Sequence, residues 1–331
     1  MRTFRSVAVV ACVAIGVLGV TTGVAWASPT VLCMKAAANG AVKGPTTVGG
    51  STCKAGFSKI TLPSSEEQEV LNKVMPYIKY KASGVGGKPT IQVSGANLQI
   101  LNGEGSTATT NGAGNLVLGY DESVSGESPE QTGSHNLAVG IEQGYRSYGA
   151  VLAGRANGAF GPYEVLFGYG NHAFGPYASV TGGDSNSAKG ESASVAGGTE
   201  NLADGLWSSV SGGAGNHAFG ILSSVSGGEG SLAEGNYSSV SGGVKGAAKG
   251  NYSSVSAGNE NIASGERSSV TGGGGNTAAG TDSSISGGGD NEASGTGSSV
   301  SGGGVNKASG EDSSIFGGKE LKAEAPFSHF P

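Results

Sequence analysis

The chain has 331 residues, of which 64 are Gly and only 10 are Pro, with 13% charged residues, 36% hydrophobic residues and a net charge of −6. Collagen would need Gly at every third position with abundant Pro, and charged disordered chains contain more charge and fewer apolar residues. The acidic balance, without a basic cluster, argues against nucleic acid as a partner. Because Gly at this density weakens helices and strands, we expect a repeat that needs tight turns.

Residues 1–27 have the pattern of a secretory signal peptide. Arg2 and Arg5 precede an apolar stretch over residues 7–20, and Ala25-Trp26-Ala27 follows it. An N-terminal membrane anchor is the alternative, but it needs about 20 unbroken apolar residues and Gly and Thr interrupt this stretch. We therefore expect an exported protein of the cell surface or extracellular space, with no integral membrane segment in the mature chain. Removal of Arg2 and Arg5 would make the net charge of the mature chain two units more negative than that of the full chain.

Residues 28–84 are expected to form a small N-terminal cap. Cys33 and Cys53 are an even pair in an exported chain, which predicts a disulfide that closes a loop of about twenty residues and contributes roughly 3 kcal/mol. Free thiols or a metal site remain as alternatives, although no His lies near either Cys in the sequence. Ser65-Glu66-Glu67 predicts the start of a short helix that Pro76 ends. Such a cap would cover an open sheet edge.

A repeat with a period of fifteen runs through the second half of the chain. Its consensus is S-S-V-S-G-G-x-x-N-x-A-x-G-x-x, and ten consecutive units keep one register. Leu152 and Leu166 precede it at a spacing of fourteen, and looser Asn-Leu units lie further upstream. We expect irregular coils over residues 85–137, starting near Pro89, regular repeats over 138–325 and a tail over 326–331. The Val or Ile of each regular unit is Val180, Val195, Val210, Val225, Val240, Val255, Val270, Ile285, Val300 or Ile315.

The repeat predicts an all-β fold, a parallel β-solenoid of 14/15-residue coils. Gly-Gly interrupts each unit and no apolar stripe of helical spacing exists, so each unit forms two short strands and two turns. Val and Ala then point inward together, a core too small for one coil to be stable alone. Coils stacked at about 4.8 Å pair with their neighbours and align the Asn side chains in a ladder, giving a rod of roughly 70 Å. Charged residues and Pro326 are expected to end the last edge.

These units resemble the head repeats of YadA-like trimeric autotransporter adhesins over about residues 138–325. The shared features are the S-V-x-x-G strand segment, the Asn position and the A-x-G corner. The resemblance implies a left-handed parallel β-roll, a homotrimer of parallel rods and a role in surface attachment. The regular unit here is longer by a single position than the unit of that family, and we expect neither its stalk nor its membrane anchor.

No catalytic, metal or cofactor site is expected. Ser is plentiful, but a nucleophile needs an adjacent base, and a Ser ladder repeated in every coil singles out no member. His172 and His217 occupy outward positions three coils apart, roughly 14 Å, and cannot share a metal. The chain is therefore predicted not to be an enzyme. The alternative is a solenoid enzyme that acts on carbohydrate. A cluster of carboxylates at one height along the rod would favour that alternative.

An outward apolar stripe is the candidate interaction surface. Stacked apolar positions expose several hundred Å², which is typical of an interface. Packing of copies in an oligomer is the first interpretation, and binding of a host-surface protein or glycan is the second. The stripe comprises Tyr177, Leu202, Leu206, Trp207, Ile221, Leu222, Leu232, Tyr237, Tyr252 and Ile262.

The predicted function is that of a secreted or cell-surface structural or adhesion protein. The alternative is a β-solenoid that binds ice or a glycan surface, because the S-V-S segments would place regular hydroxyl arrays on a flat face. Thr would be expected to dominate an ice-binding array, and here it occurs only at Thr181 and Thr271 in the second outward position.

Overall fold

The computed structural model describes residues 31–36, 42–43, 58–61, 65–122 and 131–331, and the chain divides into two units, residues 1–98 and 99–331. The predicted signal peptide and Cys53 lie outside the described residues. Cys33 lies in strand β1 (Val31–Ala36), so the predicted disulfide stays a prediction.

The first unit contains antiparallel strands and one helix. β1 pairs with β2 (Val42–Lys43) and with β3 (Ser58–Thr61). Helix α1 (Ser65–Val74) begins at the predicted Ser-Glu-Glu. Strand β4 (Ile78–Lys81), the 3-10 helix η1 (Val85–Gly87) and β5 (Thr90–Val93) then form an antiparallel hairpin.

This hairpin corrects the predicted start of the solenoid near Pro89. Gly86 and Gly87 adopt φ values of 58° and 73°, which reverse the chain and return β5 along β4. The parallel ladder begins instead at β6 (Leu116–Leu118), which pairs with β7 (Leu137–Ile141). Residues 85–115 therefore contribute no strand to the solenoid sheets.

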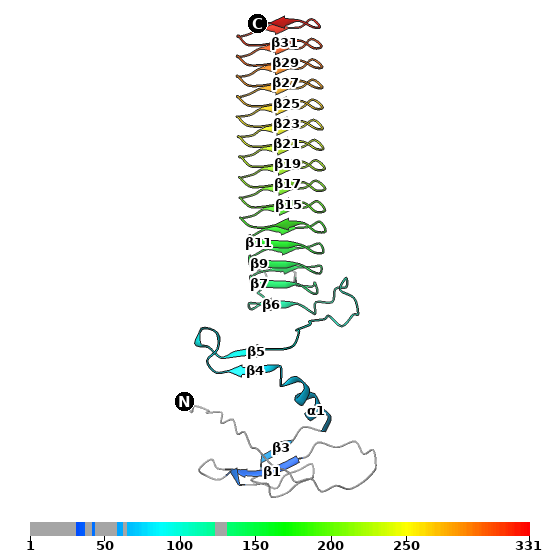
Figure 1. The fold of residues 1–331 in the computed structure, drawn as a ribbon, viewed down its shortest axis with the longest axis vertical. Coiled ribbons are helices and arrows are strands. Elements are labelled where there is room, and N and C mark those ends of the chain that lie inside the picture. The colour runs from blue at the N-terminus through cyan, green and yellow to red at the C-terminus, as the bar shows by residue number, and fades with distance from the viewer. Residues whose placement is uncertain (1–30, 37–41, 44–57, 62–64, 123–130) are drawn as a thin grey trace. The chain divides into compact units, whose positions relative to one another are not determined.

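Two parallel sheets build the second unit, as the stacked coils in Figure 1 show. The 15-stranded sheet contains β6 and β7, then β9 (Val151–Arg155), β11 (Val165–Tyr169), β13 (Ser179–Val180), β15 (Ser194–Val195), β17 (Ser209–Val210), β19 (Ser224–Val225), β21 (Ser239–Val240), β23 (Ser254–Val255), β25 (Ser269–Val270), β27 (Ser284–Ile285), β29 (Ser299–Val300), β31 (Ser314–Ile315) and β33 (His329–Phe330). The 13-stranded sheet contains β8 (Gly144–Tyr145), β10 (Gly158–Ala159), β12 (His172–Ala173), β14 (Ser187–Ala188), β16 (Leu202–Ala203), β18 (His217–Ala218), β20 (Leu232–Ala233), β22 (Ala247–Ala248), β24 (Ile262–Ala263), β26 (Thr277–Ala278), β28 (Glu292–Ala293), β30 (Lys307–Ala308) and β32 (Lys322–Ala323).

The strand register follows the sequence repeat and confirms the predicted parallel β-solenoid. Val210 pairs with Val225, and Ala203 pairs with Ala218, so each residue meets its counterpart in the next repeat unit. Isolated bridges such as Asp184 to Thr199 add a third ladder on the side that follows the Gly-Gly corner. Each regular coil therefore contributes two short strands and one bridge position.

The core consists of four inward columns, the predicted columns of Val, Ala and Asn and a fourth column of Ser. Val and Ala are almost fully buried in every regular coil, as expected. The Asn of the repeat and the first Ser of S-S-V are buried as well. The hydroxyl groups of Ser208, Ser223 and Ser238 have no hydrogen-bond partner, whereas the Ser268 hydroxyl donates to the Gly265 carbonyl at 2.7 Å. The polar Ser column was not expected from the sequence.

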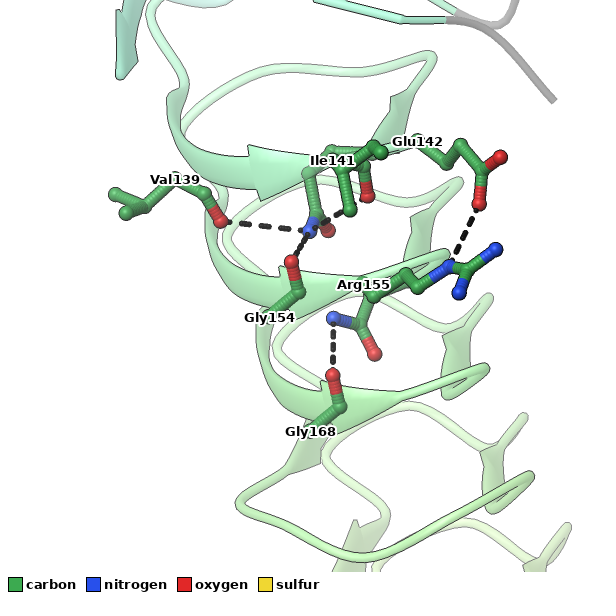
Figure 2. A network of polar contacts seen from close by, with 8 residues as sticks. Val139, Ile141, Glu142, Gly154, Arg155 and Gly168 are labelled. Carbon is green, nitrogen blue, oxygen red and sulfur yellow. Dashed lines mark hydrogen bonds and ion pairs between the residues drawn. The ribbon is translucent and has the colours of Figure 1, made fainter. Parts of the chain in front are cut away.

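The predicted Asn ladder is confirmed. The Asn216 side chain donates to the Gly212 and Gly228 carbonyls at 2.9 Å each, and its oxygen accepts the Ser231 backbone N–H at 2.9 Å. The same column begins with Gln143, whose amide donates to the Gly154 carbonyl at 2.7 Å, a contact drawn as a dashed line to Gly154 in Figure 2. Coils with Asn are thereby bonded to their neighbours through side chain and backbone, whereas Ser231, Gly246 and Leu321 interrupt the side-chain ladder.

Both ends of the second unit differ from the predictions. Residues 326–331 are not a separate tail, because β33 pairs with β31 and Phe330 packs against the core in the place of the repeat Val. At the other end, residues 99–115 bind the first coils. The Asn111 N–H donates to the Ser134 hydroxyl at 3.0 Å, and the Asn136 N–H donates to the Asn115 side chain at 2.9 Å.

Candidate functional site

One corner of the solenoid presents a column of residues with left-handed backbone. We call it the corner column; it lies two residues after the recurring corner Gly, and each member has a φ between 51° and 66°. This conformation costs a non-Gly residue roughly 1–2 kcal/mol. A hydrogen bond to the neighbouring coil offsets that cost, as between the Trp207 N–H and the Glu191 carbonyl at 3.0 Å. From Tyr163 onward the members are Tyr163, Tyr177, Ser192, Trp207, Leu222, Tyr237, Tyr252, Arg267, Asp282, Gly297, Asp312 and Phe327.

The aromatic side chains of the corner column are exposed, and they stack where they are consecutive. Tyr177 is 57% exposed and Trp207 is 51% exposed. The Tyr163 and Tyr177 rings are 5.3 Å apart at an angle of 9°, and the Tyr237 and Tyr252 rings are 4.9 Å apart at 5°. The coil spacing therefore sets the ring spacing, because each ring is attached at the same backbone position.

A second column stands beside the first, one residue earlier in each coil. We call it the rim column, and it comprises Pro162, Pro176, Glu191, Leu206, Ile221, Asn236, Asn251 and Glu266. The Asn236 side chain accepts the Ile221 N–H at 2.9 Å, and the Asn251 side chain accepts the Asn236 N–H at 3.0 Å. The rim is thus apolar in some coils and polar in others on the same backbone.

The predicted stripe divides into three parallel columns. Tyr177, Trp207, Leu222, Tyr237 and Tyr252 belong to the corner column, and Leu206 and Ile221 belong to the rim column. Leu202, Leu232 and Ile262 lie on β16, β20 and β24 of the 13-stranded sheet, where they are half-buried and alternate with His217 and Ala247. The corner column is therefore the more accessible part of the stripe.

Sequence reasoning missed a further aromatic group on the outward face of the 13-stranded sheet. The Phe160 and Phe174 rings stack at 4.8 Å, and the His172 ring stacks on Phe160 at 5.9 Å. Arg146 lies over the Phe160 ring at 4.9 Å. The duplicated N-H-A-F-G segment, which includes Phe219, was the available signal. His172 and His217 lie on β12 and β18, three coil steps apart as predicted.

The corner column becomes charged toward the C-terminal coils. The Arg267 guanidinium donates to both Asp282 carboxylate oxygens at 2.7 Å. The hydrogen bond and the positive charge of Arg267 lower the pKa of Asp282. On the 13-stranded sheet, Lys307 pairs with Glu292 at 2.9 Å and lowers the pKa of that carboxyl as well. Variants in these polar coils can therefore serve as controls for variants in the aromatic coils, because both kinds of coil share the same backbone fold.

A buried carboxyl group, that of Glu164, lies between Ala150 and Ala178 in the inward column that holds Ser in later coils. Glu164 is fully buried, and neither oxygen has a hydrogen-bond partner of normal geometry. Burial raises the pKa of Glu164 to about 8, an effect that the backbone of Gly161 and Phe160 offsets only in part. On β8, burial and Asp121 raise the pKa of Tyr145, whose hydroxyl donates to the Asp121 carboxylate at 3.0 Å.

A hollow of about 330 Å³ lies beside the first coils and is lined by Leu101, Asn102, Ser106, Thr107 and His135 among others. Both nitrogens of His135 are engaged, one with the Asn102 N–H at 3.2 Å and one with the Thr107 carbonyl at 3.2 Å. The His135 ring therefore links the backbone at Asn102 and Thr107 to the first coils.

Within the described residues, no cluster of three His, Cys, Asp or Glu side chains is placed to hold a metal ion. In the same part of the chain, no helix has the length and apolar character needed to cross a membrane. No family model matches the chain, and no curated protein is significantly similar to it in sequence.

Proposed function

We propose that the chain is an exported, non-enzymatic protein of the cell surface or extracellular space that serves structure or adhesion. The supporting observation is the corner column, where exposed aromatic or aliphatic side chains occupy every coil from Tyr163 to Tyr252 except that of Ser192. A contiguous exposed apolar surface of this kind is typical of an interaction site. A solenoid suits this role because its rigid backbone repeats one side-chain position over a long distance.

Two uses of the corner column follow from this proposal. Copies of the chain could pack through it, which the resemblance to trimeric adhesin heads favours. A host-surface protein or glycan could bind to it instead if the chain remains a monomer. In both cases Tyr237 and Tyr252 would contribute directly to the contact; their ring planes are nearly parallel, at an angle of 5°.

The test measures absolute mass by light scattering and attachment to coated or cellular surfaces for the purified chain. The variant Tyr237→Ser with Tyr252→Ser removes the ring stack, and Asp312→Ser alters the same backbone position at the polar end. We expect the double variant to lose at least tenfold in attachment, or to fall from about three chains to one in mass, while Asp312→Ser behaves as the parent. Unchanged mass and attachment in the double variant would contradict the proposal.

The flat face of the 15-stranded sheet supports a second candidate, a protein that binds an ordered surface such as ice. Ser179 through Ser314 form an unbroken Ser column on its outward side. A second hydroxyl column stands two residues later, and its exposed members are Thr181, Ser211, Ser226, Ser241, Ser256, Thr271, Ser286 and Ser301. The test is the thermal hysteresis of the parent and of the double variant Ser226→Lys with Ser256→Lys. Hysteresis in the parent that the double variant lacks would favour this candidate. A parent without thermal hysteresis would exclude ice binding.

A further inference from the structure

We propose that the corner column binds one pyranose ring of a neutral carbohydrate between Tyr177 and Trp207, at the coil of Ser192. This inference deepens the proposed binding role and rests on it.

Ser192 leaves an aromatic position empty between two rings. The Ser192 N–H donates to the Pro176 carbonyl at 2.8 Å, and the Trp207 N–H donates to the Glu191 carbonyl at 3.0 Å, so Tyr177, Ser192 and Trp207 lie in three successive coils. Two coil steps separate Tyr177 from Trp207, which is about 9.6 Å. Ser192 is half-buried, whereas the two rings are exposed.

The ring faces on either side of Ser192 lack a stacking partner. Tyr177 stacks on Tyr163 on the opposite side, with centroids 5.3 Å apart. Among the described residues, no ring contact joins Tyr177 to Trp207 or Trp207 to a ring of an adjacent coil. The face of the Tyr177 ring opposite Tyr163 therefore borders the space above the Ser192 side chain, and Trp207 stands in the coil on the other side of that space.

The spacing favours a puckered ring over a flat one. A planar aromatic group in van der Waals contact with both rings would need only about 7–8 Å, so it would touch one ring and leave the other. A pyranose chair is thicker because C–H bonds project from both of its faces. These C–H groups suit the negative face of an aromatic ring, and two such contacts would fill a space of about 9.6 Å.

At this coil the rim column supplies a polar group suited to sugar hydroxyls. Glu191 stands in the rim column between Pro176 and Leu206. It is exposed, and in the described part of the chain it makes no ion pair, so its carboxylate is available to accept hydroxyl hydrogen bonds. The Ser192 hydroxyl adds one donor or acceptor below the ring. Apolar walls with a few polar groups are typical of small-ligand sites, and the Glu191 charge disfavours acidic sugars.

Trp207 makes the site directly observable. The chain contains two Trp residues, so in a Trp26→Phe background the fluorescence reports Trp207 alone. The probes are soluble hexasaccharides of glucose, mannose and N-acetylglucosamine, with a hexasaccharide of a uronic acid as the charged comparison. We expect a saturable change of Trp207 emission with at least one neutral probe and a response at least tenfold weaker with the acidic probe.

Ser192→Tyr supplies the missing ring and should abolish the response, since the ring stack would then be continuous. Asp312→Tyr is the matched control, because it introduces the same side chain at the same backbone position in a distant coil. Glu191→Gln should weaken the affinity several-fold. Far-UV circular dichroism of each variant shows that the solenoid is intact.

A parent that responds to none of the neutral probes overturns the proposal, and so does a response that survives Ser192→Tyr or is equally lost in Asp312→Tyr. Surface attachment distinguishes this failure from failure of the proposed function. Attachment that depends on Tyr237 and Tyr252 while Trp207 gives no response leaves the adhesive role intact and removes only the sugar site. A Trp207 response without surface attachment would keep the sugar site and contradict the proposed adhesive role.

Discussion

Glu164 lies in the same inward column as Ala178, one coil away, and carries a carboxyl group where Ala178 carries a methyl group. Both residues are fully buried at the step before a strand of the 15-stranded sheet, and the Val165 N–H donates to the Ala178 carbonyl at 3.2 Å. The solenoid therefore tolerates one ionisable group at a position that elsewhere holds only Ala, Ser or Asn.

Glu164 should make the solenoid less stable as the pH rises. Its folded-state pKa of about 8 exceeds the ordinary value of 4.5, so the folded state retains a proton that the unfolded state has lost between these pH values. The free energy of unfolding should fall across that window by a few kcal/mol at most and level off above pH 8. Denaturant unfolding from pH 4 to pH 9 measures this slope. Glu164→Gln should flatten it, and the exposed control Glu311→Gln should not; equal slopes in the parent and Glu164→Gln would refute this assignment.

Gly205 should not tolerate a side chain. A Cβ atom there would collide with the Gly220 carbonyl oxygen of the next coil, which is part of the backbone and cannot move aside alone. We expect Gly205→Ala to lower the free energy of unfolding by about 3 kcal/mol or more, in the range of severe core strain. Gly212→Ala is the matched control, since no atom lies within 4 Å of its Cβ position. Thermal unfolding compares the two, and equal melting temperatures would disprove the packing argument.

The sequence predicted the parts of the fold that recur with the period of the repeat. Val210 and Ala203 were placed inward, and the Asn ladder was foreseen, because each recurs at a fixed distance in almost every unit. Features carried by one coil were missed. Glu164 has no counterpart in other units, and the turn before Thr90–Val93 depends on the φ values of two Gly residues instead of a period.

The candidate site was predicted in composition but not in geometry. Trp207 and Tyr252 were identified as outward, yet the sequence did not show that both occupy a left-handed corner position. The hints were Gly149 and Gly297 in the same column, since Gly readily adopts positive φ. The significance of Ser192 emerged only when the register placed it between two exposed rings.

The Asn216 side chain should contribute more to the free energy of unfolding than an ordinary polar side chain. Its side chain makes three hydrogen bonds of 2.9 Å to backbone groups of its own and the next coil. Asn216→Ala removes all three bonds, and we expect a loss of roughly 2–4 kcal/mol in the free energy of unfolding. Asn216→Ser should cost less, because Ser231 already occupies this column in the next coil. Asn236→Ala, at the solvent-facing rim, is the control for denaturant unfolding, and a loss as large as that of Asn216→Ala would argue against a special role of the ladder.

Replacing a buried Ser of the inward column should stabilise the solenoid or leave it unchanged. The Ser223 hydroxyl is buried without a hydrogen-bond partner, so folding removes it from water with no compensating bond. Ala178 and Ala193 show that a methyl group fits this column. We expect Ser223→Ala to raise the free energy of unfolding by about 1 kcal/mol, whereas Ser226→Ala on the exposed face should change it by less than about 0.5 kcal/mol. A clear loss of stability in Ser223→Ala, measured by denaturant unfolding, would mean that this hydroxyl does find a partner. The Gly220 carbonyl, which corresponds to the acceptor of Ser268 at Gly265, would then be the group to test.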